Sequence, residues 1–450
     1  MGIWAVASDM ASKTPEERNR YVDFLRAVSI LVVVIGHWLI ATAWVVDGEI
    51  AVGHLLKDQP QTQWLTWMFQ VMPIFFIVGG YSNAVSLESA RRKGLGYAGW
   101  LVTRLNRLVS PLLVLIIAWA AISLVMTLMG VQVGVIRYLS QAALIPTWFL
   151  AIYIMVAILA PLAYRFWQKA GFLSFWCFVA IAALVDLAFF AADIRWLGWT
   201  NYFWVWLAVH QLGFAWRDGR MGRPMLLLVY SAIAFWVLYD LIVHGPYPLA
   251  MVGSPDEGLS NTLPPKVTLI ALGVFQFGLL LALENPMRRL MSGLRLWTAT
   301  VLINSMIMTV YLWHITVMVL FGAALYLSGG FGLGLEPGSP EWWYSRPLWI
   351  LVLIALLTPV ALLLSPLERR GRSKDASVPS APRQIAGAMM ICLGVSLLAM
   401  FGFGGGPGIE AFRPPIVALI EIVVLEYTDV FAFSLVILGS GISGLLPKLR

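Results

Sequence analysis

Long apolar stretches recur along the 450-residue chain, and most are about as long as a helix that crosses a lipid bilayer. Hydrophobic residues make up 60% of the chain and charged residues only 12%, against roughly a quarter charged in ordinary globular domains. A water-soluble fold has too little interior to hide so many apolar side chains. The pattern therefore predicts an all-α, polytopic transmembrane helical bundle. Twelve such stretches can be placed, at residues 27–46, 65–87, 108–129, 146–164, 172–191, 201–216, 224–243, 267–283, 297–327, 347–364, 385–403 and a last one ending near residue 446.

The 30 Lys and Arg residues are distributed unevenly between the loops that would connect these helices. With the N-terminus in the cytoplasm, 24 of the 30 fall in cytoplasmic segments, and the other six are Lys57, Arg137, Arg195, Lys266, Arg346 and Arg413. Cytoplasmic loops of membrane proteins carry such an excess. We therefore expect a multi-pass protein of the cell membrane with both termini in the cytoplasm. The net charge of +7 then indicates contact with membrane lipids and not with nucleic acid.

The apolar pattern also predicts how the chain is divided. A cytoplasmic segment, 1–20, precedes a ten-helix membrane unit over 21–365. A basic cytoplasmic linker, 366–384, leads to a C-terminal membrane segment, 385–450, with one or two spanning helices. Glu421, Glu426 and Asp429 interrupt the last stretch, so residues 415–428 either cross the membrane or lie at its interface. Only two cysteines are present, Cys177 and Cys392, and they offer neither a disulfide framework nor the spacing of a metal site.

The first apolar stretch carries the polar pair that most favours a functional site. Arg26 lies at its cytoplasmic edge, and His37 follows eleven residues later. Eleven helical steps end about 20° beyond three full turns, so both side chains share one face, roughly 16 Å apart along the axis. His37 would lie near the middle of the bilayer, where a polar side chain is a functional candidate by default. A neutral imidazole there can accept a proton, although a histidine bonded to a neighbouring helix for packing fits the same pattern.

Other polar positions are weaker candidates. The ninth stretch has a polar strip that either completes a pocket with His314 or makes hydrogen bonds between helices; it comprises Asn304, Ser305, Thr309, Tyr311 and His314. Arg104 and Arg107 are one helical turn apart at the cytoplasmic edge, where they suit a diphosphate or anionic lipid. Tyr81 and Trp148 rank lower, because aromatic residues are routine at membrane interfaces.

Five motifs, in chain order, resemble the acyltransferase-3 family of membrane-bound acyltransferases. The first is Tyr21-Val-Asp23-Phe-Leu-Arg26-Ala with His37 at the R-x10-H spacing. The second, Met72-Pro73-Ile-Phe75-Phe76-Ile-Val-Gly79-Gly80-Tyr81, has Gly79 where the family usually has Ser. The others are Arg104-Leu-Asn-Arg107 followed by Pro111, Thr147-Trp148-Phe149-Leu150, and Tyr311-Leu-Trp-His314. The resemblance covers roughly residues 20–365.

The resemblance implies transfer of an acyl group, usually acetyl, from cytoplasmic acyl-CoA to a hydroxyl of a cell-envelope glycan, a glycolipid or another lipophilic acceptor. It implies acyl-CoA as co-substrate, no bound cofactor or metal, and in some cases a partner subunit that completes the transfer. His37 would be the catalytic base or a transient acyl carrier. Arg26 would orient that site or meet coenzyme A phosphates, with Asp23 as its partner. Donor binding would fall to Arg104 and Arg107, and acceptor binding to His314, Tyr311, Tyr81 and Trp148.

Two other functions fit the apolar pattern. A twelve-helix secondary transporter or lipid flippase also places polar residues near the bilayer midplane. The sequence shows neither a correspondence between its halves nor paired broken helices, which are typical of such transporters. A membrane scaffold or partner subunit is the third possibility, and it would not depend on His37 and Arg26.

Overall fold

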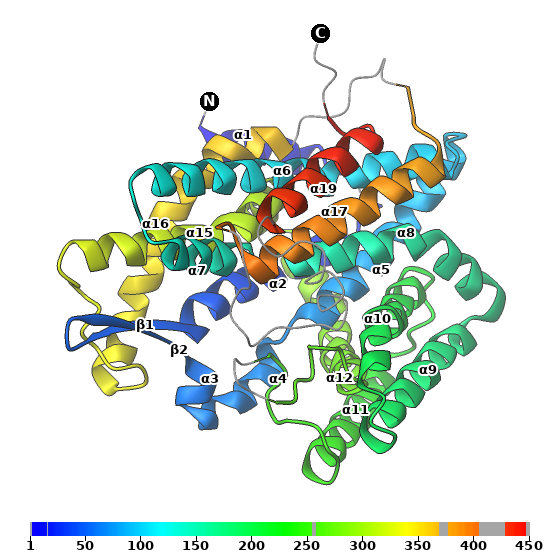
Figure 1. Cartoon of the computed structure of the whole chain (residues 1–450). Coiled ribbons are helices and arrows are strands. Elements are labelled where there is room, and N and C mark those ends of the chain that lie inside the picture. Colours follow the sequence, from blue (N-terminus) through cyan, green and yellow to red (C-terminus); the bar gives the residue numbers. More distant parts are fainter. Residues whose placement is uncertain (1, 16, 254–257, 369–376, 405–427, 447–450) are drawn as a thin grey trace. The chain divides into compact units, whose positions relative to one another are not determined.

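The computed structural model describes residues 2–15, 17–253, 258–368, 377–404 and 428–446 (Figure 1). Their architecture is helical, with one two-stranded β-hairpin. The chain divides into two compact units whose segments alternate in sequence. The first unit comprises Met1–Gly36, His54–Ser86 and Ala160–Ile307, and the second comprises His37–Gly53, Leu87–Leu159 and Met308–Arg450.

Among the described residues, nine helices are long and apolar enough to cross a membrane, or ten if a pair bent by 54°, α12 (Thr268–Ala282) and α13 (Glu284–Leu290), forms one span. The chain is thus a multi-pass, all-α membrane protein. Three of the twelve predicted stretches account for the difference. The stretches at 201–216 and near 446 form helices of only 17 and 15 residues, and the stretch at 267–283 qualifies only together with α13.

The first unit contains most of the helices that precede residue 306. Its helices are α1 (Ile3–Ser12), most of α2 (Arg20–Ile40), α3 (Leu55–Asp58), η1 (Pro60–Leu65), α4 (Thr66–Phe69), the first part of α5 (Met72–Arg92), the last part of α8 (Thr147–Ala170), α9 (Phe172–Ala191), η2 (Arg195–Thr200), α10 (Asn201–Arg217), α11 (Pro224–Val243), α12 (Thr268–Ala282), α13 (Glu284–Leu290) and α14 (Leu294–Ser305).

Helices α5 and α10 approach one another closely at two glycines of the first unit. A Cβ atom at Gly80 would collide with the backbone carbonyl of His210, and one at Gly213 with the carbonyl of Ile77. Small residues allow membrane helices to pack backbone against backbone. Gly80 belongs to the second family motif, so this motif has a packing role in the first unit.

The second unit contains the hairpin and the remaining long helices. Its elements are the end of α2, β1 (Ala41–Val46), β2 (Glu49–His54) up to Gly53, the end of α5, α6 (Tyr97–Leu128), α7 (Val133–Leu144), the first part of α8, α15 (Ile307–Leu327), α16 (Pro340–Glu368), α17 (Ala381–Phe401) and α19 (Thr428–Ile442).

The hairpin replaces the last turns of the first predicted span. Residues 27–46 were expected to be helical, but α2 ends at Ile40 and the chain then pairs as β1 and β2. Asp47 and Gly48 form the turn with φ angles of 52° and 83°, and such an Asp-Gly pair suits the two-residue hairpin turn. The β-branched and aromatic residues that precede the turn favour strand over helix.

The C-terminal helices pack into the second unit. Helices α17 and α19 lie side by side (Figure 1), and a Cβ atom at Gly394 would meet the carbonyl of Ala432. The Gln384 amide of α17 donates to the carbonyl of Ala98, 3.0 Å away in the first turn of α6. The interfacial segment considered for residues 415–428 lies, apart from Thr428, outside the described residues, and so do residues 369–376 of the predicted linker.

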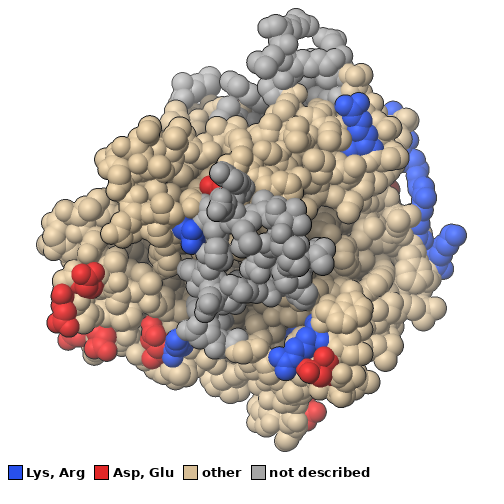
Figure 2. Space-filling view, in the orientation of Figure 1, with Lys and Arg blue, Asp and Glu red and all other residues tan. Residues whose placement is uncertain are grey.

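Large apolar side chains are exposed along the spanning helices. Leu128, Met225 and Leu363 each expose more than 70% of their surface, which suits contact with lipid acyl chains and not with water. Figure 2 shows the same property on one face, where most of the described surface is neither acidic nor basic.

Candidate active site

His37 lies in the last turn of α2, three residues before the helix ends at Ile40. The sequence placed it at the middle of an apolar helix over 27–46, and this part of the prediction is wrong because the strand β1 takes the residues after Ile40. Arg26 and His37 still belong to one continuous helix, as the R-x10-H spacing requires. The chain passes from the first unit to the second at His37.

His37 and His314 form a hydrogen-bonded pair in the second unit. The His37 Nδ1 and His314 Nε2 atoms are 2.8 Å apart, and the ring planes differ by only 7° with centroids 5.1 Å apart. His314 is completely buried on α15, whereas His37 is half-buried. Two of the predicted site residues, 277 positions apart in sequence, therefore meet directly.

The backbone fixes which nitrogen of each neutral ring carries the hydrogen. His314 Nδ1 is 2.6 Å from the carbonyl oxygen of Tyr311, and a carbonyl oxygen can only accept, so Nδ1 donates. His314 Nε2 is then the acceptor, and His37 Nδ1 donates to it. The lone pair of His37 consequently resides on Nε2, which is the nitrogen that can act as a base.

Three further contacts hold the His314 ring and its helix. The Trp38 indole N–H donates to the His314 carbonyl at 3.0 Å and thereby ties α2 to α15 beside the pair. The Tyr311 hydroxyl donates to the Pro146 carbonyl at 2.6 Å, at the start of α8. The Trp119 indole of α6 donates to the Thr316 hydroxyl at 3.0 Å. The second unit thus presents a pre-oriented imidazole pair.

Trp148 and Tyr311 lie in the same unit but differ in their relation to the histidine pair. Phe149 stands between them, packed edge-on against Tyr311 at 5.7 Å and against Trp148 at 6.4 Å between ring centroids. Tyr311 is 4% exposed and contacts the histidine pair through its backbone. Of these two predicted substrate-binding residues, the structure brings only Tyr311 into direct contact with His314.

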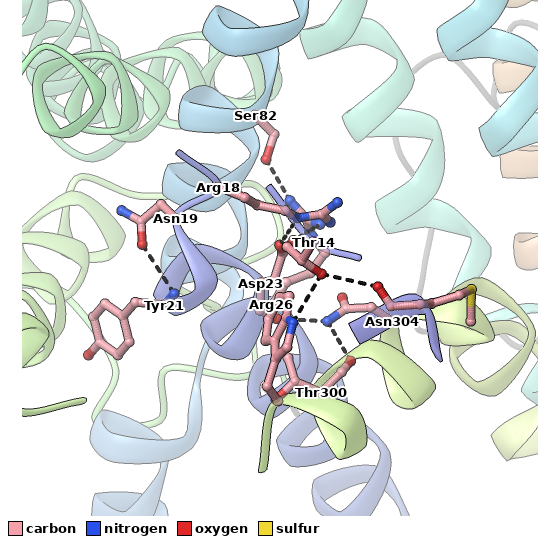
Figure 3. Close-up of polar contacts among 11 residues, drawn as sticks. Thr14, Arg18, Asn19, Tyr21, Asp23, Arg26, Ser82, Thr300 and Asn304 are labelled. Carbon is pink, nitrogen blue, oxygen red and sulfur yellow. Dashed lines mark hydrogen bonds and ion pairs between the residues drawn. The ribbon is translucent and has the colours of Figure 1, made fainter. Parts of the chain in front are cut away.

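The first unit holds a separate charged cluster at the start of α2 (Figure 3). Asp23 is buried and accepts from Arg26 Nη1 at 2.9 Å and from Arg18 Nε at 2.6 Å. The other terminal nitrogen of Arg26 donates to the Ser82 hydroxyl of α5 at 2.5 Å. The predicted pairing of Asp23 with Arg26 is therefore present in the structure.

Backbone contacts explain why α2 begins at this cluster. The Asn19 side chain accepts from the Tyr21 amide at 3.1 Å and so caps the helix, while its own amide donates to Glu284 at 3.1 Å. The Asn304 amide of α14 donates to the Asp23 carbonyl at 2.9 Å. Within its predicted polar strip, Asn304 shares α14 with Ser305, whereas Thr309, Tyr311 and His314 follow the break at Met306 on α15 and belong to the second unit.

Among the remaining predicted site residues, Tyr81 borders the charged cluster through a side-chain hydrogen bond with Asn19, whereas Arg104 and Arg107 lie on α6. Arg104 stacks over Trp100 at 5.8 Å on α6, and Arg107 is exposed one turn further along this helix. Both belong to the second unit. Tyr81 packs against Trp216 in the first unit, with ring centroids 5.0 Å apart.

A second buried charged group of the first unit lies between α11 and α12. Lys266 is 1% exposed, and its ammonium group lies 3.9 Å from the centroid of the Phe189 ring and 3.2 Å from the Pro264 carbonyl oxygen. Burial lowers the pKa of Lys266 to about 8, and the nearby Asp186 carboxylate offsets part of this effect. Asp186 itself accepts from Asn201, Tyr247 and the Val267 amide. The sequence marks Asp186 as an acid within an apolar stretch, but it does not predict these partners.

Sequence reasoning also missed partners of the two main groups. Arg18 counted only as a cytoplasmic positive charge, and Ser82 and Trp38 were not singled out. Ser82 follows Tyr81 in the second family motif, which was the available signal. Arg18 and Trp38 have none, because their contacts depend on residues brought near by the fold.

The comparisons with known proteins agree with the motifs. The family model of acyltransferase-3, described as an acyltransferase domain, matches residues 19–366. No curated protein and no solved structure is significantly similar to the chain. The match covers well over half of the 450 residues and includes Asp23, Arg26 and the histidine pair. The chain therefore belongs to the acyltransferase-3 family of membrane acyltransferases.

Proposed function

We propose that this chain is an integral membrane O-acyltransferase that moves an acyl group from cytoplasmic acyl-CoA to a hydroxyl group, with acetyl as the first candidate for the acyl group. The acceptor is a cell-envelope glycan, a glycolipid or another lipophilic alcohol. Family membership supports the reaction class, and nine candidate spans support its place in a membrane. The observation that carries the catalytic assignment is the 2.8 Å contact between His37 and His314.

In the proposed reaction, the Nε2 lone pair of His37 takes the proton of the acceptor hydroxyl. The oxygen attacks the thioester carbonyl carbon, a C–O bond forms, and the C–S bond breaks when the tetrahedral intermediate collapses. The proton then passes from His37 to the departing thiolate, so the products are the ester and coenzyme A with a free thiol. Such base assistance contributes on the order of 10²–10⁴ in rate.

His314 is a positioning residue in this reaction and not a second base. Its Nε2 accepts from His37 Nδ1 and keeps the basic lone pair on the other nitrogen. When His37 becomes an imidazolium ion, the same hydrogen bond stabilises the charge, as the orienting carboxylate does in a serine hydrolase triad. A neutral imidazole does this more weakly than a carboxylate.

Arg26 is assigned to orientation, because two of its three guanidinium nitrogens are already bound by Asp23 and Ser82. Donor recognition falls instead to Arg104 and Arg107, whose one-turn spacing on α6 suits the diphosphate of coenzyme A. Tyr81 and Trp148 are kept as candidates for contact with the acceptor. Acyl-CoA is the co-substrate in this scheme.

Consumption of the thioester tests the proposal. The full chain is reconstituted in lipid vesicles and given acetyl-CoA together with an extract of envelope glycans and lipids, and the free thiol is measured with a thiol reagent. An acyltransferase releases thiol only when the extract is present. A transporter or flippase releases none, and that result would reject the proposed function.

A further inference from the structure

The cluster around Asp23 carries more positive than negative charge. One carboxylate accepts from two guanidinium groups, those of Arg18 and Arg26, so the three side chains together have a net charge of +1. The N-terminus of the 21-residue helix α2 begins at Arg20 and adds its own partial positive charge. Anions are therefore attracted to this end of the first unit.

The two arginines differ in how much of each guanidinium group is used. Arg26 binds Asp23 through one terminal nitrogen and Ser82 through the other, and its side chain is 19% exposed. Arg18 binds Asp23 through Nε alone, and its side chain is 55% exposed. No described residue accepts a hydrogen bond from the two terminal nitrogens of Arg18. These two nitrogens form the end of the fork that matches two oxygens of a phosphate.

The position of Arg18 is built into the fold. Asn19, the next residue, caps α2 and is bound to Glu284, and Asp23 is held at its backbone by Asn304. Figure 3 shows Arg18 and Arg26 approaching the same carboxylate from the N-terminal segment and from the helix. The family match begins at residue 19, so Arg18 lies just outside the matched residues.

We propose that Arg18 is a phosphate-binding residue whose terminal N–H groups take two oxygens of a phosphate while Asp23 stays paired with Arg26. No covalent step is involved. The phosphate comes either from coenzyme A, as its ribose phosphate and not the diphosphate assigned to Arg104 and Arg107, or from the headgroup of an anionic lipid. The first source rests on the proposed acyltransferase function. Asp23 keeps Arg26 as its charge partner, so the carboxylate stays paired while the terminal N–H groups of Arg18 bind the phosphate.

Binding by purified full chain in neutral detergent tests the proposal, with coenzyme A and pantetheine as probes. Arg18→Gln is compared with Arg195→Gln, a matched control in the same unit whose arginine is 70% exposed and paired with Asp193. We expect Arg18→Gln to raise the Kd of coenzyme A about tenfold, the effect of losing a charge-assisted bidentate contact. Pantetheine, which lacks the phosphates, should bind equally to all three proteins. Arg18→Lys, which keeps the charge but loses the fork, should fall in between.

A second arm identifies the source of the phosphate. The same variants are placed in nanodiscs with and without phosphatidylglycerol, and their thermal stability is measured. A lipid source predicts that phosphatidylglycerol stabilises the wild type and Arg195→Gln but not Arg18→Gln, while coenzyme A binds equally to all. The proposal is overturned if Arg18→Gln matches the wild type in both arms. Thiol release by the wild type is measured on the same preparations. If the wild type releases thiol and Arg18→Gln behaves like the wild type in both arms, only the phosphate site is refuted. If the wild type releases no thiol and Arg18→Gln loses binding, only the acyltransferase function is refuted.

Discussion

The two ends of helix α2 carry opposite kinds of polar site. At its start, in the first unit, Asp23 is bound by two arginines, and Ser82 and Asn304 complete the cluster. At its end, in the second unit, two neutral imidazoles share one hydrogen bond, and a carbonyl fixes their tautomers. The first site is ionic, and Asp23 and Arg26 each have more than one partner. The second has a single proton donor and a single acceptor between its rings.

This difference assigns different tasks to the two residues of one sequence motif. A charge that is fully paired, as Arg26 is, holds elements together and is poorly placed to exchange protons. A neutral imidazole with its Nδ1 hydrogen committed to a partner presents a basic lone pair on Nε2. Changes at the start of α2 should therefore alter stability and anion binding, and changes at its end should alter the chemical step.

The largest expected effect is that of His37→Ala. Loss of the base should lower the rate of thiol release about 10²–10⁴-fold, while thermal stability in detergent changes little. His244→Ala is the matched control, because His244 is an exposed histidine paired with Asp240 and has no role in the proposed reaction. Equal loss of activity in both variants would remove the contrast between the two ends of α2.

Asp23→Asn should act mainly on stability. The change leaves the Arg26 guanidinium without its charge partner in a largely buried site, and breaking such a pair costs about 3 kcal/mol. Asp193→Asn, which breaks an exposed pair in the same unit, should have almost no effect. Denaturant unfolding monitored by tryptophan fluorescence provides the measurement. A stable Asp23→Asn protein that has lost only its activity would argue that Asp23 takes part in the chemistry.

His314 should have an intermediate effect that depends on the replacement. His314→Leu removes the acceptor for His37 Nδ1. A hydrogen bond to a charged group contributes about 1.5–3 kcal/mol, and its loss in the transition state lowers the rate roughly tenfold to a hundredfold. His314→Gln supplies a carbonyl oxygen and should recover part of the rate. If His314 were purely structural, the activity of each variant would follow its thermal stability. His314→Gln would then be no more active than a His314→Leu protein of equal stability.

The smallest expected effect is the loss of the Lys266 charge. Lys266 contrasts with Arg26 in the same unit, because its buried cation is held by a carbonyl oxygen and an aromatic ring. Burial lowers its pKa to about 8 in the folded protein, from 10.5. Between these values the unfolded chain binds more protons, so stability must rise with pH. The wild type should gain about 2 kcal/mol between pH 7 and pH 9.5 from this group. Lys266→Met should lack that share of the gain, which unfolding curves at several pH values will measure; parallel curves for the two proteins would contradict the assignment.

Much of the fold follows from the sequence, because each bilayer span must be about 20 mostly apolar residues long. Helix α9 coincides with its predicted stretch, 172–191, and α11 with 224–243. The hairpin at 41–54 was not predicted, since apolar β-branched residues continue the hydrophobic run of α2 without a change in composition. The break at Met306 was missed because neither proline nor glycine marks it, and the polar Asn304 and Ser305 just before it were assigned to one continuous helix.

The candidate site was predictable in its members but only partly in its contacts. The spacing of Asp23 and Arg26 on one helix was enough to expect their pairing. The contact of His37 with His314 depends on packing of α2 against α15, which no local pattern encodes. Arg18 was not predictable as a partner of Asp23, because a residue that precedes the helix reaches the carboxylate only through the geometry of the Asn19 cap.

Mass spectrometry of the acceptor tests the central claim most directly. Envelope glycans and lipids are compared between cells that produce the wild-type chain and cells that produce His37→Ala at equal levels in the membrane. The account predicts a molecule that is heavier by one acyl group in the wild-type cells and unmodified in the variant. The same mass increment with both proteins would contradict His37 as the base, and no increment with either would contradict the acyltransferase function itself.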